Sequence, residues 1–241
     1  MRNAKLLLVF LVLALAVNST WAQRRNQIEF YAGAAFPLGP EVFKEYTKVG
    51  LSGNAQYVLF PSPRLGITFN VGYEFFSVDN GKFVEAVSQA NTGQPASYWA
   101  SLTYSTPSGP VTINPSADIK STLTRFGAGI RPYLTAPEAN TQIFLLGQVN
   151  YNIITNDFNV TELPVSYDSN LGFLNWLTLN DEQYEAQLEE NDDKAVGIGL
   201  GGGLEIPAGT SFNIVVQGLF NVLFTADEST SFVGVTAGVV F

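Results

Sequence analysis

Apolar and polar residues alternate most clearly in residues 194–224. In the first half of this segment, Val196, Ile198 and the apolar residues that follow them are separated by glycine at nearly every second position. After a turn at residues 207–210, bulky apolar residues within residues 212–224 alternate mostly with Ser, Asn and Gln. A period of two over about a dozen residues on each side of a short turn predicts a β-hairpin.

The same alternation recurs outside this hairpin and predicts six more strands, giving eight in all. These strands cover about residues 26–36, 48–60, 65–75, 120–134, 142–153 and 232–241. The connections between successive strands alternate between long and short, which predicts that all long loops lie at one end of an up-and-down sheet. The longest connections are residues 77–119, with an expected short helix at Phe83–Ala90 and weak alternation at Tyr98–Tyr104, and the acidic residues 154–193.

The composition indicates which face of these strands meets the surroundings. Only 14% of the residues are charged, whereas roughly 25 to 35% of a soluble surface is charged. We therefore expect the apolar rows to face lipid, where a sheet is stable only when it closes on itself. The predicted fold is an all-β, eight-stranded antiparallel transmembrane β-barrel. The alternative is a soluble lipocalin-like barrel, whose apolar rows would face inward around a hydrophobic ligand.

The first residues differ from the rest of the chain. Arg2 and Lys5 precede an apolar run, Leu6 to Val17, and small residues follow up to Ala22. This order predicts a secretory signal peptide at residues 1–22, cleaved to leave one barrel domain at residues 23–241. Without Arg2 and Lys5, ten basic residues face 21 acidic ones, a net charge of −11, which disfavours nucleic acid as a partner.

The chain contains neither Cys nor His. The usual zinc ligands and the usual general base are therefore missing, and we expect no metal, no cofactor and no catalytic residues. Gly197, Gly199 and Gly202 have the spacing of a dinucleotide-binding turn, but they fall inside one strand instead of between a strand and a helix. Their expected role is to make room for larger side chains inside a narrow barrel.

Five charged residues point inward if the apolar rows point outward. They are Glu29, Glu74, Arg125, Arg131 and Glu205. They could line a polar pathway, or they could form a paired network that fills the lumen. We favour the network because the interior of an eight-stranded barrel is just wide enough to be filled by side chains.

The third long connection is rich in carboxylates, which are hard oxygen ligands. It carries Asp157, Glu162, Asp168, Asp181, Glu182, Glu185, Glu189, Glu190, Asp192 and Asp193. Calcium or magnesium binding is conceivable, but no EF-hand spacing is present. The simpler interpretation is a solvated loop with a short helix at Asn180–Glu190.

The glycine-alternating hairpin and the last strand, Phe232 to Phe241, resemble small bacterial outer-membrane barrels of the OmpA and OmpX type. The resemblance implies that Phe241, together with Val239, forms the terminal signal read by the barrel-assembly machinery. It also implies short turns and both termini on the periplasmic side, long loops outside, and aromatic girdles at the strand ends. Tyr57, Tyr73, Tyr133 and Tyr151 are the tyrosines expected in those girdles.

These observations favour a non-enzymatic outer-membrane protein, embedded in outer-membrane lipid, that supports envelope integrity or presents its loops for surface contacts. A narrow porin-like channel for ions or small solutes is the alternative. A third hypothesis is an accessory barrel that contacts a secretion or surface-assembly system through its loops. An enzyme is the least favoured class, because known barrel hydrolases and acyltransferases of this architecture resemble one another in using His.

Overall fold

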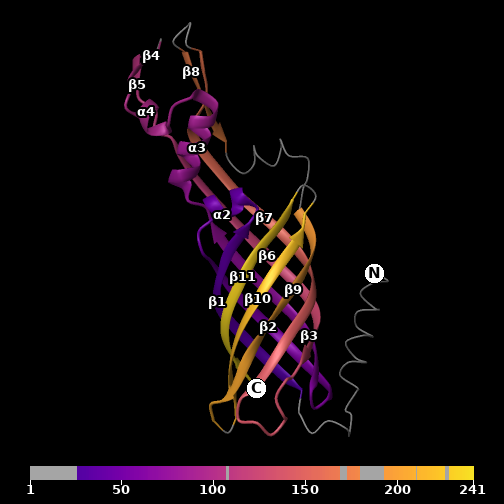
Figure 1. The fold of residues 1–241 in the computed structure, drawn as a ribbon. Helices are drawn as coiled ribbons and strands as arrows, with labels where there is room; N and C mark the ends of the chain where they lie inside the picture. The colour runs from indigo at the N-terminus through magenta and orange to yellow at the C-terminus, as the bar shows by residue number, and fades with distance from the viewer. Residues whose placement is uncertain (1–25, 107–108, 169–172, 180–192, 210, 226–227) are drawn as a thin grey trace, which may run out of the picture.

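The computed structural model describes residues 26–106, 109–168, 173–179, 193–209, 211–225 and 228–241. Eight long strands form a barrel (Figure 1): β1 (Gln27–Gly39), β2 (Gly50–Ser62), β3 (Leu65–Ser77), β6 (Ser116–Pro132), β7 (Gln142–Asp168), β9 (Asp193–Pro207), β10 (Asn213–Phe224) and β11 (Ser229–Val240). The smaller elements are α2 (Glu41–Tyr46), α3 (Asn80–Thr92), α4 (Ala96–Ala100), β4 (Tyr104–Thr106), β5 (Gly109–Val111) and β8 (Phe173–Leu179).

The sheet closes on itself, as the sequence predicted. The strand order is β6-β3-β2-β1-β11-β10-β9-β7, and an additional pairing of β6 with β7 completes the ring. Every neighbouring pair in the ring is antiparallel. The first and last strands meet along a continuous register from Glu29 opposite Val240 to Phe36 opposite Val233, so the ring has no open edge between its termini.

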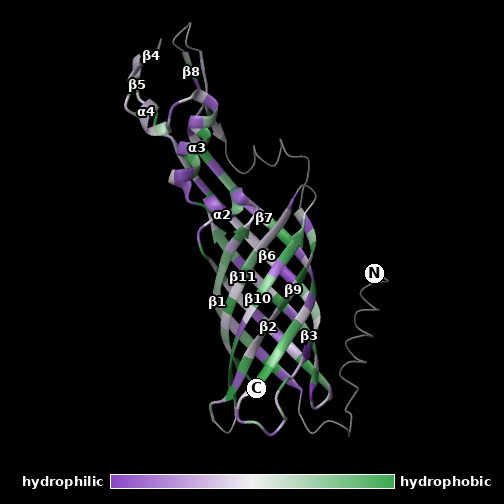
Figure 2. Ribbon diagram, viewed as in Figure 1, coloured by the Kyte–Doolittle hydropathy of each residue, from purple (hydrophilic) through white to green (hydrophobic). Residues whose placement is uncertain are grey.

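The apolar rows face outward, as predicted from the low charge content. Phe69, Val216 and Phe220 are 45%, 44% and 42% exposed, respectively. The alternate positions are polar and buried, such as Gln56, Asn150 and Gln217. Figure 2 shows the resulting alternation of hydrophobic and hydrophilic residues along the barrel strands. An apolar exterior around a polar interior suits a barrel that is surrounded by hydrocarbon.

The barrel has two different ends. The C-terminus and the turns between β2 and β3 and between β6 and β7 lie at one, the terminal end. From the other, the extension end, a long projection rises away from the barrel (Figure 1). It consists of the first residues of β6, the second half of β7, β8, and the helices and short hairpin between β3 and β6.

The projection corrects two predictions. In the acidic connection expected at residues 154–193, the described residues are strand: β7 continues to Asp168, and Phe173–Leu179 forms β8 on it. The reason is that β6 already starts at Ser116, outside the barrel wall, and offers β7 a partner there. Ser116 pairs with Thr161, and Lys120 pairs with Asp157. A strand with a partner need not stop where its acidic residues begin.

The second correction concerns Tyr98–Tyr104, whose weak alternation left open an extension of the barrel wall. The first part of this segment lies instead in helix α4, which starts directly after Pro95. Proline is well suited to the start of a helix because its missing N–H would be unbonded there in any case. The helix predicted at Phe83–Ala90 is confirmed and is longer than expected, spanning Asn80–Thr92.

Several expectations fall outside the described residues. They are the signal peptide at residues 1–22, the helix at Asn180–Glu190, and the carboxylates from Asp181 to Asp192. Among the described residues, no helix is both long and apolar enough to cross a bilayer.

Candidate functional site

An ion pair fills the barrel interior near the terminal end. The Arg131 guanidinium donates to both carboxylate oxygens of Glu29, at 2.7 Å each, and both side chains are completely buried. Arg131 also donates to the hydroxyl oxygens of Tyr31 at 2.9 Å and Tyr133 at 3.3 Å. Tyr31 in turn donates to Glu29. Two parallel hydrogen bonds between a guanidinium and a carboxylate fix the geometry as well as the charge balance of the pair.

Glu205 of β9 joins this cluster. Its carboxylate accepts hydrogen bonds from the Tyr133 hydroxyl at 3.3 Å, from Asn213 Nδ2 at 2.7 Å and from Gln27 Nε2 at 3.0 Å. The ring of Phe144 lies 4.2 Å from the guanidinium carbon of Arg131, within cation–π distance. Buried apolar side chains, among them Val58, Phe60 and Leu146, pack in the same region. Strands on all sides of the ring thus contribute to one plug, which we call the terminal plug.

A second ion pair lies farther toward the extension end. Arg125 Nη2 donates to Glu74 Oε1 at 2.6 Å, Arg125 Nη1 donates to Asn221 Oδ1 at 3.1 Å, and Ser52 donates to the same Glu74 oxygen at 3.3 Å. Both charged side chains are buried. The five charged residues singled out in the sequence therefore sit in the lumen as two separate groups, Glu29 with Arg131 and Glu205, and Glu74 with Arg125.

Uncharged polar side chains occupy the level between the two groups. Asn70 Nδ2 of β3 donates to Gln148 Oε1 of β7 at 3.0 Å, past β6, which lies between these two strands in the ring. Glycines on the inner face leave room for these groups: a Cβ on Gly72 would lie 3.0 Å from Arg125 Nη2, and one on Gly199 would lie 2.8 Å from Gln148 Cγ. The expected role of the inward glycines therefore matches the distances in the barrel.

An apolar layer closes the interior at the extension end. Ala35, Phe76, Leu123, Ala195, Leu223 and Phe232 form one buried cluster there. The rings of Phe76 and Phe232 meet edge to face, 5.7 Å apart. Phe43 of α2 packs on Phe76 from outside, with ring centroids 5.3 Å apart. This layer, which we call the outer plug, separates the polar interior from the medium beyond the barrel.

The projection has its own small cores. Val84 of α3 and Ala96 of α4 form a buried cluster with Val160 and Leu163 of β7. Farther out, the buried Trp99 lies 4.7 Å from the ring of Tyr167, and Tyr104 lies 6.1 Å from Trp176. Burial, together with the nearby Tyr98 and Tyr167, raises the pKa of the Tyr104 hydroxyl above its usual value. Aromatic side chains with exposed edges are typical of contact surfaces.

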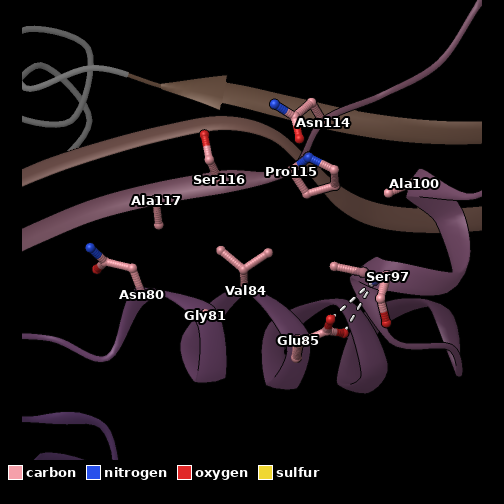
Figure 3. A pocket seen from close by; sticks show the side chains of 11 residues that line it. Asn80, Gly81, Val84, Glu85, Ser97, Ala100, Asn114, Pro115, Ser116 and Ala117 are labelled. Atoms are coloured by element: carbon pink, nitrogen blue, oxygen red, sulfur yellow. Dashed lines mark hydrogen bonds between the residues drawn. The ribbon is translucent and has the colours of Figure 1, made fainter.

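A cavity of about 280 Å³ lies between α3, α4 and the start of β6 (Figure 3). Small residues such as Gly81, Ala100 and Ala117 line it. The Glu85 carboxylate accepts two hydrogen bonds from the backbone N–H of Ser97, at 3.2 and 3.3 Å, and so ties α3 to α4. The carboxylate thus serves the packing of the two helices.

The described part of the chain contains no group of three or more acidic side chains arranged to hold a metal ion. Three of the acidic residues singled out in the sequence, Asp157, Glu162 and Asp168, lie on β7. Asp157 pairs with Lys120 in the sheet register. Glu162 accepts a hydrogen bond from the backbone N–H of Asn114 at 2.6 Å, so it connects the strand to the segment before β6.

Comparison with known proteins gives likenesses of architecture. No family model and no curated protein matches this chain. Among solved structures, Neisserial surface protein A is 12% identical, with 89% of this chain and 95% of that chain covered, at a TM-score of 0.42. A major outer membrane protein of Thermus thermophilus is 10% identical, with 90% and 99% covered and a TM-score of 0.45. The attachment invasion locus protein Ail of Yersinia pestis is 10% identical, with 90% of this chain and 100% of that chain covered, at a TM-score of 0.40.

The fold is that of a small outer-membrane β-barrel. That statement depends on the closed antiparallel ring and the apolar exterior of this chain, since each likeness has a TM-score below 0.5. Phe241 directly follows β11 and exchanges two backbone hydrogen bonds with Ile28, at 2.9 and 3.2 Å, while its side chain is 62% exposed. Val239 lies opposite Phe30 in the same strand pairing.

One girdle prediction is wrong, and it concerns a residue whose inward position the sequence analysis missed. Tyr133 was expected at the lipid boundary but is only 4% exposed, inside the terminal plug. Tyr73 and Tyr151 are 51% and 44% exposed, on the outer wall. The signal was available, because Tyr133 is two residues from Arg131 and therefore lies on the same, inward face. Tyr31 is likewise two residues from Glu29 and therefore also lies inside the barrel.

Proposed function

We propose that this protein is a non-enzymatic integral protein of the bacterial outer membrane, with a closed lumen and a surface projection used for contacts. In this orientation both termini lie in the periplasm and the projection extends into the medium. Support for the orientation comes from the difference between the two ends, because outer-membrane barrels keep short turns in the periplasm and long loops outside.

The observation that carries the proposal is the double occlusion of the lumen. The terminal plug crosses the interior through Arg131, Glu29 and Glu205, and the outer plug crosses it through Phe76 and Phe232. Eight strands enclose a space just wide enough for side chains to fill. A barrel of this kind serves as a rigid base, and its contacts with partners are then made by the projection.

A narrow channel is the second candidate, because one feature of the interior favours it. Between the plugs, Asn150 Oδ1, Gln217 Oε1 and Thr236 Oγ1 are buried polar atoms without a hydrogen-bond partner among the described residues. Such atoms are commonly satisfied by ordered water. A hydrated middle section would conduct if both plugs moved aside.

Planar-bilayer recording separates the two candidates. The purified wild-type barrel is expected to give no steady openings across a range of voltages. A variant with the terminal plug removed, Glu29→Ala with Arg131→Ala, and the outer plug reduced, Phe76→Ala with Phe232→Ala, is the positive control and is expected to conduct. Steady, uniform openings of the wild type would instead support the channel. Affinity purification from native membranes, with and without residues 80–118, then tests whether the projection recruits a partner such as a secretion system.

A further inference from the structure

The outer mouth of the barrel contains a cavity of about 290 Å³ that the closed lumen does not explain. Its floor is the outer plug: Phe76, Leu123, Leu223 and Phe232 line the cavity and are each no more than 5% exposed. Phe43 of α2 and Ile154 of β7 complete the apolar part of the lining. The mouth of a β-barrel is one of the places where proteins preferentially bind small molecules.

The polar part of the lining consists of uncharged side chains. Ser121, Asn156, Thr225 and Thr230 line the cavity with hydroxyl and amide groups, and no charged side chain lies among the described lining residues. Ser121 and Asn156 follow the inward rows of β6 and β7, two residues farther out than the apolar Leu123 and Ile154. The cavity therefore has an apolar bottom and an uncharged polar rim.

We infer that this cavity binds a small, neutral, amphipathic molecule with its apolar body on the outer plug and its hydrogen-bonding end at the rim. The size of the ligand follows from the volume of the cavity, because an apolar cavity of about 150 Å³ is sufficient for benzene. A cavity of about 290 Å³ accordingly accepts a body of two fused rings or a short acyl chain. Charge is disfavoured because none of the described lining residues would compensate a buried carboxylate or ammonium group.

Three residues define the contacts that such a ligand would make. Phe43 and Phe76 present aromatic rings to the body of the ligand, as they already present them to each other. Asn156 offers both a donor and an acceptor at the rim. Because Phe43 belongs to the short helix α2 between β1 and β2, the ligand would also contact an element outside the barrel wall.

The test is a binding titration with the full-length mature barrel in phospholipid nanodiscs. The probe is 2-naphthol, which is neutral at pH 7, fluoresces, and has a two-ring body with one hydroxyl group. Naphthalene and 2-naphthoate are the comparison probes, since they lack the polar end and carry a charge, respectively. Empty nanodiscs give the contribution from partitioning into lipid.

Saturable binding of 2-naphthol above the empty-nanodisc level is expected, with at least tenfold weaker binding of 2-naphthoate. Asn156→Leu should weaken the binding of 2-naphthol by about five- to tenfold, because one hydrogen bond is lost. It should leave the binding of naphthalene unchanged. Ser121→Phe, which places a ring in the cavity, should abolish saturable binding. Thr124→Phe is the matched control, because Thr124 lies on the same strand but on the opposite face.

Any of three results overturns the inference: uptake of 2-naphthol no greater than by empty nanodiscs, equal binding of 2-naphthoate, or saturable binding that Ser121→Phe leaves intact. If Ser121→Phe fails to fold, Thr230→Phe fills the same cavity from β11. Because the measurement depends only on the mouth of the barrel, its outcome is independent of whether the interior conducts.

Discussion

Arg131 and Glu29 show why single residues matter inside this barrel. Both are fully buried, and each provides the neutralising charge for the other. Desolvation makes a buried ion pair only weakly stabilising overall, but the loss of one partner leaves an uncompensated charge. The hydrogen bonds from Arg131 to Tyr31 and Tyr133 would be lost at the same time.

We therefore expect Arg131→Met to destabilise the barrel by about 3–5 kcal/mol, measured by urea unfolding in lipid vesicles. Combining it with Glu29→Gln should recover part of the loss, because the buried carboxylate is then removed as well. The matched control is Lys120→Met, since the ion pair of Lys120 with Asp118 is solvent-exposed and is worth about 0–1 kcal/mol. Equal effects of the two single substitutions would contradict the buried pair.

Phe241 presents the opposite case, a residue whose side chain contributes little to the folded structure. Its backbone is bonded to Ile28, while its ring is largely exposed. Phe241→Ala is therefore expected to change the stability of the refolded barrel by about 0.5 kcal/mol or less, as for other surface substitutions.

In cells the same variant should reach the outer membrane in clearly lower amounts, if the barrel-assembly machinery reads Phe241 as the resemblance to small outer-membrane barrels implies. The measurement compares the amount of folded protein in membranes with the unfolding curve of the purified protein. Phe36→Ala, another exposed aromatic on the outer wall, is the control and should assemble normally. Unchanged assembly of the Phe241 variant would remove the proposed signal.

At the scale of the element, the hairpin of β9 and β10 contains glycines with different roles. A Cβ on Gly201 would lie 2.0 Å from the carbonyl oxygen of Gly218, so only a backbone shift could accommodate it. A Cβ on Gly218 would meet no atom within 4 Å. The two residues lie on the inner and outer faces of the same hairpin, diagonally across one strand pairing.

Gly201→Ala should therefore destabilise the barrel by about 1–3 kcal/mol, the usual effect of overpacking. Gly218→Ala should be neutral, or stabilising by about 0.4–1 kcal/mol, because alanine restricts the unfolded chain. Urea unfolding of both variants under identical conditions checks the difference. Equal destabilisation by the two substitutions would show that strand conformation, and not the crowded interior, requires glycine here.

At the scale of the whole molecule, the proposed orientation follows from the difference between the two barrel ends. Because the chain has no Cys, a single introduced thiol reports the location of one site. Ala90 is exposed on α3 of the projection, and Glu138 is exposed in the turn between β6 and β7 at the terminal end.

On intact cells, a membrane-impermeant maleimide should label Ala90→Cys and not Glu138→Cys. After the outer membrane is permeabilised, both should be labelled to a similar extent. Labelling is quantified by a mass shift on a gel. The reverse pattern on intact cells would place the projection in the periplasm and would exclude its proposed role in surface contacts.

The alternation of side chains predicted the eight barrel strands and their two faces, the lengths of the connections predicted the up-and-down order, and the low charge content predicted that the apolar face is outward. The physical reason is local, because successive side chains on a strand point to opposite faces whatever lies beside it. The same parity identified Glu29, Arg131 and Glu205 as inward residues. Applied to Tyr133, it predicts an inward position as well. Only the tertiary structure decided which inward residues meet: Arg131 of β6 reaches Glu29 of β1, which is not a neighbouring strand in the ring, whereas Arg125 of β6 reaches Glu74 of the adjacent β3.

The projection and the mouth cavity likewise depended on tertiary structure. Residues 154–168 carry the acidic and polar side chains of a loop, yet they remain a strand because β6 and β8 supply hydrogen-bond partners. The cavity is lined by residues from five strands and from α2. The periodicity of the sequence does not show that these residues lie together. Local sequence thus determined the faces of each strand, whereas long-range pairing determined where the strands continue and what they enclose.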